Sequence, residues 1–350
     1  MAGDLHAMVR LRTVSANSKG WTRRRAGRGF VYLDADGTRL PPEAVERIRA
    51  LVIPPAWQDV WICPHANGHL QAVGTDAAGR RQYLYHPEWR VRRDLAKHER
   101  VAKVARRLPA AREAIALHLA LQGMPRDRAA AAAVRLLDLG YFRIGSDSYT
   151  DSFGLTTLRR EHVRRRNGAL VFQFVGKSGI EHRVEIDDLP AVEAVEVMRR
   201  RRGGDDRLLA YKDGRRWGPL DGPSVNSYLR EIVGDEITAK DFRTWHATVL
   251  AAAALAASDE HGESAASRKR AIRGAMVEVA EYLGNTPTVA RNSYVDPAVI
   301  DLYEDGVTIE AALRRAPEDP ALRQAALERA TLRLLKQAPE ALRRRARRIG

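Results

Sequence analysis

The sequence is short of cysteine, of acidic residues and of long apolar runs. Its 350 residues include one cysteine, Cys63. A single thiol cannot form an intramolecular disulfide or a cysteine zinc cluster, and it suits a reducing cytosolic compartment. The first residues, Met1 to Arg10, lack the apolar core of a signal peptide, and no window reaches the roughly 18 apolar residues of a membrane span. We therefore expect a soluble, cytoplasmic protein that needs no disulfide.

Acidic residues are outnumbered by basic ones. The chain has 59 Lys and Arg against 44 Asp and Glu, a formal net charge of +15. Such a charge predicts a polyanionic partner, although charge alone does not separate DNA from RNA or an anionic membrane. The basic residues are spread through segments that look folded, which favours a basic groove over a sticky tail.

Neither a nucleotide-binding loop nor a metal site is expected. Gly176-Lys177-Ser178 has part of a phosphate-binding loop, but that motif needs a glycine five positions before Gly176, where Val171 stands. Residues 170–175 and 181–186 instead predict a hairpin with Lys177 at its tip. A lysine in such a place is usually just solvated. The sequence has no carboxylate cluster typical of a metal site.

The length allows two domains, and the composition changes near Trp89. Residues 1–88 are rich in short β-forming runs bounded by turn residues, so we predict a small β-rich N-terminal domain. Residues 89–305 follow helical repeats and predict a mainly α-helical domain. Residues 306–350 are rich in Arg and Ala, and we expect a helical extension that is solvated or loosely bound to DNA. The predicted fold class is α+β.

Two segments combine basic and aromatic or apolar residues. In the predicted strand Arg81 to Tyr85, Tyr83 and Tyr85 alternate onto one face, which predicts either a surface for nucleic acid or two half-buried tyrosines. Arg143 lies among apolar neighbours, and burying an unpaired guanidinium is costly. It therefore pairs with a carboxylate or reaches into a site for an anion.

A third segment places three basic residues on one predicted helix. Lys240, Arg243 and His246 recur every third residue before an alanine-rich run. This spacing predicts neighbouring positions on one helix face. The alternative is an ordinary charged helix start.

Tyr294 follows the end of a predicted helix. An apolar stripe up to Leu283 ends at Gly284, which supplies a left-handed stop. We expect Pro287 to keep the chain out of helix, and Asp296-Pro297 to begin a new one. Tyr294 is then an exposed phenol in a turn between two helices, or a tyrosine packed beneath a loop.

Taken together, these residues resemble the catalytic domain of type IB DNA topoisomerases, specifically the small poxvirus-like kind found in bacteria. The resemblance covers nearly the whole chain to about Tyr303. Its most specific pieces are Lys240-Asp241-Phe242-Arg243-Thr244, the Gly284 to Pro287 turn with Ser293-Tyr294 after it, and Arg143 followed by Tyr149. The segment Gln82-Tyr83 with Tyr85 looks like the family's DNA-contacting strand. Asn285 departs from the poxvirus pattern, which has histidine there.

The resemblance implies a fold and a set of roles. The β-rich domain and a helical domain of the type shared with tyrosine recombinases would form a clamp around double-stranded DNA. Tyr294 would attack a phosphodiester and form a 3′-phosphotyrosyl link. The strand would then swivel and be resealed without ATP, metal or other cofactor. The remaining implied roles are phosphate contacts from Arg143, Arg243 and Asn285, proton donation from Lys177, and DNA contacts from Gln82, Tyr83, Tyr85, Tyr149, Lys240 and His246.

Two other functions compete with this interpretation. A tyrosine site-specific recombinase would share the nucleophile and the arginines, but the β-rich N-terminal domain argues against it. A non-enzymatic basic DNA-binding protein would explain the charge, but the ordered appearance of Arg143, Lys177, Arg243, Asn285 and Tyr294 would then be a coincidence. We expect a monomer associated with the nucleoid, with no nucleotide or membrane partner.

Overall fold

The computed structural model describes residues 10–147, 151–234, 236–258 and 264–338. The chain divides into two compact units, Met1–His98 and Glu99–Gly350. The division falls inside helix α2 (Pro87–Ala105). No helix in the described part of the chain combines the length and apolar character that crossing a membrane requires.

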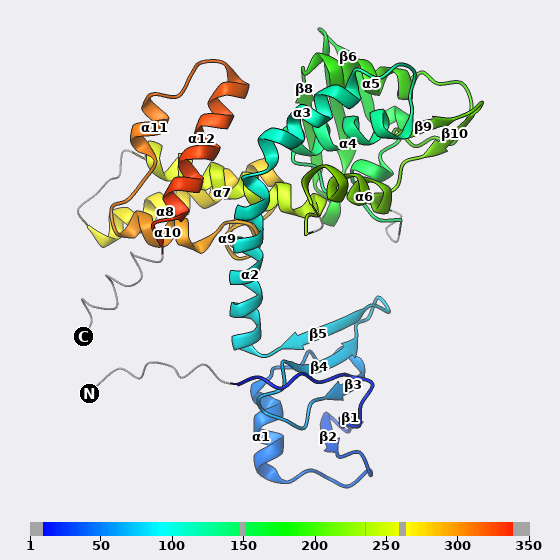
Figure 1. The fold of residues 1–350 in the computed structure, drawn as a ribbon. Helices are drawn as coiled ribbons and strands as arrows, with labels where there is room; N and C mark the ends of the chain where they lie inside the picture. Colours follow the sequence, from blue (N-terminus) through cyan, green and yellow to red (C-terminus); the bar gives the residue numbers. More distant parts are fainter. Residues whose placement is uncertain (1–9, 148–150, 235, 259–263, 339–350) are drawn as a thin grey trace. The chain divides into compact units, whose positions relative to one another are not determined.

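The described part of the first unit consists of a five-stranded antiparallel sheet, helix α1 (Pro42–Ala50) and the first part of α2, which Figure 1 labels. Its core joins Ile48 of the helix to Val60, Ile62 and Ala72 of the sheet. The strand order is β2-β1-β3-β4-β5. The strands are β1 (Trp21–Ala26), β2 (Gly29–Leu33), β3 (Gln58–Ile62), β4 (Leu70–Thr75) and β5 (Arg81–Tyr85). This confirms the predicted β-rich N-terminal part.

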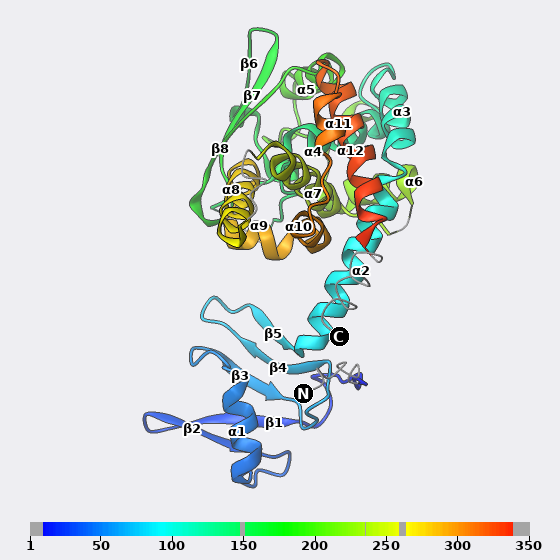
Figure 2. The ribbon, with the colours of Figure 1, turned by 90° about the vertical axis from the view of Figure 1, so that its left-hand side faces the viewer.

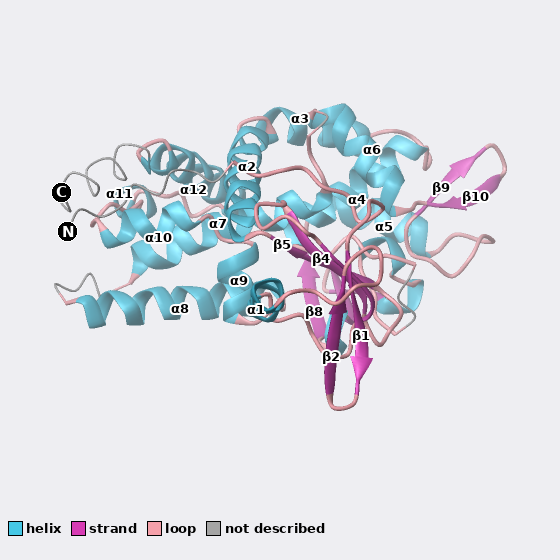
Figure 3. Cartoon of the chain, turned by 90° about the horizontal axis from the view of Figure 1, so that it is seen from below, coloured by secondary structure: helices cyan, strands magenta, loops and turns pink. Residues whose placement is uncertain are grey.

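The second unit is mainly helical, which confirms the predicted fold class (Figure 3). After α2, its helices are α3 (Leu108–Leu119), α4 (Arg126–Gly140), α5 (Leu189–Arg199), α6 (Gly222–Val233), α7 (Ala239–Ala257), α8 (Ala265–Leu283), α9 (Pro287–Ser293), α10 (Pro297–Glu304), α11 (Glu310–Arg314) and α12 (Pro320–Leu335). Short 3₁₀ turns cover η1 (Leu155–Thr157), η2 (Arg160–His162) and η3 (Lys177–Gly179).

Two small antiparallel sheets complete this unit. Strands β6 (Val163–Arg166), β7 (Ala169–Val175) and β8 (Glu181–Ile186) lie side by side in Figure 2, and β9 (Ala210–Asp213) pairs with β10 (Arg216–Pro219). The β7–β8 pair is the predicted hairpin, with its tip at η3.

Helix α7 lies at the centre of the helical unit. It contacts α4, α6, α8, α10, α11 and α12, and its residues from Asp241 to Val249 are all buried. Helix α4 carries the run Ala129 to Ala133, which is also buried. Small side chains let neighbouring helices approach closely, and α3, α5, α6 and α7 all contact α4. The catalytic candidates therefore stand on a densely packed support.

Helix α4 ends at Gly140, and the residue after it, Tyr141, takes the left-handed conformation, with φ 52°. A left-handed residue with a side chain is uncommon and is held by its surroundings. Here the Tyr141 ring packs edge-on against His246 of α7, with 4.5 Å between ring centroids.

The prediction of a solvated C-terminal extension is wrong for α12. Leu327, Thr331 and Leu334 of this helix are buried, and α12 contacts α7 and α10. The many arginines hid an apolar face, because one buried residue in every three or four is enough to pack a helix. The basic run within residues 339–350 lies outside the described residues.

Candidate active site

Tyr294 lies between two helices, but the approach to it is helical. Pro287 is the first residue of α9, and Thr286 caps that helix by accepting a hydrogen bond from the Val289 amide at 3.3 Å. The expectation that Pro287 keeps the chain out of helix is wrong, because proline is well suited to a first helical position. Helix α10 begins at Pro297 as predicted.

The phenol of Tyr294 faces two cations of α7. The Arg243 guanidinium carbon lies 5.3 Å from the centroid of the Tyr294 ring, and the Lys240 Nζ lies 5.8 Å from it. Tyr294 is half-buried and packs against the core, so the predicted exposed phenol is only partly accessible. The tyrosine is thus supported on one side and open on another.

Helix α7 also anchors the main chain at Tyr294. The Thr248 hydroxyl accepts from the Asp296 amide at 3.1 Å and lies 3.4 Å from the Tyr294 carbonyl, while its proton has a closer acceptor in the Thr244 carbonyl at 2.8 Å. The sequence analysis missed Thr248. The spacing in the sequence could have indicated it, because Thr248 follows Lys240 by eight residues, about two turns along the same side of the helix.

Arg243 is buried, with 4% of its surface exposed, and it is held by main-chain oxygens. Its Nη1 donates to the Tyr141 carbonyl, and its Nη2 donates to the Leu283 carbonyl at 2.7 Å. Neither partner carries a formal charge, and the structure shows no ion pair of Arg243 with a carboxylate of the described residues. The positive charge is therefore held in place without being neutralised. Burial lowers the pKa of Arg243 to about 10.

Arg143 reaches the turn that follows α8. Its Nη2 donates to the Gly284 carbonyl at 3.0 Å and to the Asn285 Oδ1 at 2.6 Å. Among the described residues it has no carboxylate partner, which favours the anion-site alternative. The Asn285 Nδ2 is buried and has no hydrogen-bond partner. An unsatisfied buried donor beside two arginines is suited to an anionic oxygen.

These charges act on the phenol. Burial alone would raise the pKa of Tyr294, but Arg243, through its charge and as a hydrogen-bond donor, and the charges of Arg143 and Lys240 outweigh burial. The net effect is a pKa below the ordinary range of a phenol. A lower pKa makes the phenolate easier to form near neutral pH, as a tyrosine nucleophile requires.

Lys177 is not in contact with this group. It is exposed at the hairpin tip, and the structure shows no hydrogen bond or ion pair between Lys177 and any described residue. Gly176 before it is buried. The histidine of β8, His182, lies between Gly176 and Gly284, and the sequence analysis missed it. No pattern in the sequence predicts that strand β8 lies next to the end of α8.

His246 does not face Tyr294. Its Nε2 lies 3.1 Å from the Asp138 Oδ1, and only 4% of its surface is exposed. Three residues advance a helix by about 300°, so six residues leave Lys240 and His246 about 120° apart. The prediction that all three basic residues share one face holds for Lys240 and Arg243 and is wrong for His246.

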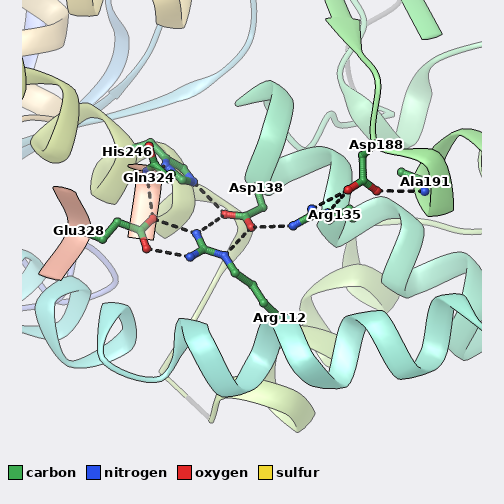
Figure 4. Close-up of polar contacts among 8 residues, drawn as sticks. All are labelled: Arg112, Arg135, Asp138, Asp188, Ala191, His246, Gln324 and Glu328. Carbon is green, nitrogen blue, oxygen red and sulfur yellow. Dashed lines mark hydrogen bonds and ion pairs between the residues drawn. The ribbon is translucent and has the colours of Figure 1, made fainter. Parts of the chain in front are cut away.

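His246 instead belongs to a buried charged network, shown in Figure 4. Arg112 of α3 contacts Asp138 of α4 at 2.8 Å and Glu328 of α12 at 2.7 Å. Gln324 of α12 lies within 3.4 Å of the second His246 nitrogen. The network ties four helices together behind Tyr141, whose carbonyl holds Arg243.

Arg135 extends the network to helix α5. Its guanidinium contacts Asp138 at 3.7 Å and Asp188 at 2.5 Å. Asp188 in turn caps α5 by accepting from the Ala191 amide at 3.1 Å (Figure 4). Removing Asp138 would therefore leave two arginines and a histidine without a shared acceptor.

We expect Asp138→Asn to destabilise the helical unit by about 3 kcal/mol, because it removes the buried counter-charge shared by both arginines and His246, although Arg112 keeps Glu328 and Arg135 keeps Asp188. Burial would raise the pKa of Asp138, but the hydrogen bonds and charges of Arg112 and His246 hold it far below its usual range. A carboxyl group whose pKa is lowered in the folded state stabilises the fold at pH values above its unfolded pKa of about 4. This contribution to stability is lost as the pH falls below that value towards the folded pKa.

The measurement is chemical denaturation of both proteins from pH 7 down to pH 3. The stability difference should be largest at pH 7 and shrink below about pH 4. Glu185→Gln is the matched control, because its partner Arg183 is 3.8 Å away and both side chains are more than half exposed. Equal stability of Asp138→Asn and the parent at pH 7 would contradict the role given to the network.

The candidate DNA contacts of the first unit lie on β5. Tyr83 and Tyr85 are 49% and 37% exposed, and their rings stack with 6.2 Å between centroids. The Gln82 side chain donates to Asp76 at 2.9 Å. The two tyrosines thus form an exposed aromatic face. Tyr149 lies outside the described residues.

A metal centre would need clustered ligands. Within the described ranges there is no group of three or more His, Cys, Asp or Glu residues placed to hold a metal ion. Cys63 is buried.

Two family models match this chain. The model described as eukaryotic DNA topoisomerase I, catalytic core, matches residues 86–315, and the one described as bacterial DNA topoisomerase IB, N-terminal domain, matches residues 29–76. The DNA topoisomerase 1B of Acanthamoeba polyphaga mimivirus is 28% identical over 299 residues, which cover 82% of this chain and 88% of that protein. The DNA topoisomerase 1B of vaccinia virus (strain Copenhagen) is 21% identical over 267 residues, which cover 71% and 76% of the two chains.

Proposed function

Because this chain belongs to the type IB DNA topoisomerase family, we propose that it relaxes supercoiled DNA by transient cleavage of one strand at Tyr294. The observation that carries this proposal is the pair of guanidiniums beside the phenol. Arg143 and Arg243 are both fixed by uncharged acceptors and so keep their charge for a phosphate. The family is an isomerase family that acts on DNA.

The proposed cleavage exchanges one phosphodiester for another. The Tyr294 oxygen forms a bond to phosphorus as the bond from phosphorus to the 5′-oxygen breaks. The phenol proton goes to solvent, and the leaving 5′-oxygen gains a proton from Lys177. The products are a 3′-phosphotyrosyl strand and a free 5′-hydroxyl, and the reverse reaction reseals the strand after it swivels.

Each charged or polar side chain has a separate task in this scheme. Arg143 and Arg243 stabilise the charge that grows on the non-bridging oxygens in the pentacoordinate transition state. Asn285 donates to one of these oxygens through its unpartnered Nδ2. An alkoxide leaves poorly, so proton donation by Lys177 at the hairpin tip speeds its departure.

We propose further that the reaction needs neither ATP nor a metal ion, and that one chain is sufficient. The bond energy is conserved in the tyrosyl link, and the arginine pair supplies the positive charge that Mg²⁺ supplies elsewhere. Tyr83 and Tyr85 on the first unit, and Lys240 beside Tyr294, are proposed DNA contacts. The two units would then bind the duplex together as a clamp.

A plasmid assay tests the function. Purified protein is incubated with supercoiled plasmid in EDTA without ATP, and the products are separated by gel electrophoresis. We expect a ladder of topoisomers and complete relaxation. A recombinase would give exchange products only on its paired sites, and a non-enzymatic DNA-binding protein would leave the plasmid supercoiled. Either outcome would overturn the proposal.

A further inference from the structure

His182 of strand β8 lies in the active site without an assigned task. Its ring stacks on Phe174 of the neighbouring strand, with 5.1 Å between centroids and 17° between planes. Phe174 stacks in turn on Phe142, with 5.9 Å between ring centroids, and Phe142 directly precedes Arg143 in the chain. The structure shows no hydrogen bond or ion pair of the His182 ring with any described residue. The ring is thus fixed by packing.

Two glycines make room for this ring. A Cβ at Gly176 would lie 2.5 Å from the His182 Cδ2, and a Cβ at Gly284 would lie 2.2 Å from its Cε1. Real Cβ atoms do not approach other atoms so closely, so no larger residue fits either position with the ring in place. The imidazole therefore touches both main chains directly.

The backbone conformation separates the reasons for the two glycines. Gly284 has φ 58°, a left-handed conformation that favours glycine in any case. Gly176 has φ −93°, which any residue adopts, so its backbone does not require glycine. Glycine is required at position 176 because the His182 ring occupies the space of a side chain there. The residue directly before Lys177 is therefore in contact with the ring.

Both glycines directly precede proposed catalytic residues. Gly176 is followed by Lys177 at the hairpin tip, and Gly284 by Asn285. The Gly284 carbonyl also accepts the hydrogen bond from Arg143. One imidazole thus joins the loop that carries the lysine to the turn that carries the phosphate contacts. The hairpin backbone is also held by its own ladder and by the Phe153 amide, which donates to the Val175 carbonyl at 2.8 Å, but the Lys177 side chain has no hydrogen bond or ion pair with a described residue.

We propose that His182 is a positioning residue, which docks the Lys177 hairpin on the Gly284–Asn285 turn and so places the lysine for proton donation to the 5′-oxygen. This inference rests on the proposed function, because it takes Lys177 as the acid. The imidazole is suited to the task when it is neutral. Burial lowers the pKa of His182, and repulsion by Arg143 and Arg243 lowers it further.

The test compares single-turnover cleavage of two DNA substrates. One has the ordinary 5′-oxygen at the cleavage site and the other has sulfur in its place, which leaves without a proton. If His182 acts through Lys177, His182→Ala should slow cleavage of ordinary DNA by up to ~10²-fold, the effect of a misplaced catalytic group. The same variant should cleave the thio substrate at close to the parent rate.

His118→Ala is the matched control. His118 is also a half-buried histidine of the helical unit, and it bonds Tyr228 at 2.7 Å between α3 and α6. It should cleave both substrates at the parent rate. If His182→Ala is equally slow on both substrates, or not slowed at all, the positioning role is overturned.

A double-mutant cycle with Gly176→Ala gives a second, independent readout. The added methyl should push the His182 ring away and slow cleavage of ordinary DNA, whereas in the His182→Ala background it should have almost no further effect. Residues in direct contact give such non-additive changes, and independent ones do not. Additive effects would contradict the contact on which the proposal depends.

Lys177→Ala measured alongside separates two kinds of failure. If the thio substrate does not restore the cleavage rate of Lys177→Ala, the assignment of Lys177 as the acid fails, and with it the basis of the inference. If it restores the cleavage rate of Lys177→Ala but not that of His182→Ala, only the positioning role of His182 fails. Circular dichroism and DNA binding of each variant verify that the fold is retained.

Discussion

Tyr294→Phe is expected to lose all covalent attachment to DNA and all plasmid relaxation, while it keeps its fold and its affinity for DNA. The substitution removes only the phenolic oxygen, and without a nucleophile no phosphotyrosyl link forms. The hydrogen bond from Arg243 is lost with the oxygen, but the ring can keep its packing against the core and its place beside the guanidinium. Trapping on a denaturing gel measures the covalent complex, and a native gel measures binding.

Tyr282→Phe is a suitable control for this experiment. Tyr282 is 58% exposed near the end of α8, and its ring packs edge-on against Tyr141 at 4.8 Å. It lies close in sequence to Asn285 but has no role in the proposed reaction, so its variant should cleave DNA as the parent does. Covalent complexes formed by Tyr294→Phe would mean that another tyrosine is the nucleophile.

Lys177→Ala is expected to cleave ordinary DNA about 10² to 10⁴ times more slowly, the usual contribution of general acid catalysis. With sulfur in place of the bridging 5′-oxygen, the leaving group needs no proton, and the variant should cleave at close to the parent rate. A lysine that only holds the phosphate would show no such recovery. The measurement is the single-turnover rate on both substrates.

Arg143→Ala provides the contrast for Lys177. Its proposed partners are the non-bridging oxygens, which the thio substrate does not change, so it should remain slow on both substrates. Equal slowness of Lys177→Ala on both substrates would transfer proton donation to another residue. Lys240, whose amine lies near the Tyr294 ring, is then the first to test.

The local features of the fold were predictable from the sequence, since they depend on near neighbours in the chain. The β7–β8 hairpin, the helix that begins at Pro42 and the left-handed Gly284 follow from turn residues, proline and periodicity. Apart from Pro287, which begins a helix, the errors concern burial. The basic helix α12 packs on α7, and His246 turns inward to Asp138, because tertiary partners far along the chain decide which face is buried.

The candidate site was predictable only in part, for the same reason. Residue types and their order indicated Arg143, Arg243 and Tyr294, and the family resemblance gave them roles. The sequence could not indicate which atoms hold the arginines. Main-chain carbonyls of Tyr141, Leu283 and Gly284 do so, and a carbonyl has no signature in a sequence. His182 escaped notice because it meets Gly284 only in the folded chain.

The central claim is that Tyr294 forms the link to the 3′ end of the cut strand. The most direct measurement is to trap the covalent complex of the parent protein on a duplex labelled at one end of one strand, digest it with protease and identify the modified peptide by mass spectrometry. The account predicts a single modified residue, Tyr294, attached to the fragment that keeps the strand's original 5′ end. Attachment to any other residue, or to the fragment that keeps the original 3′ end, would contradict it.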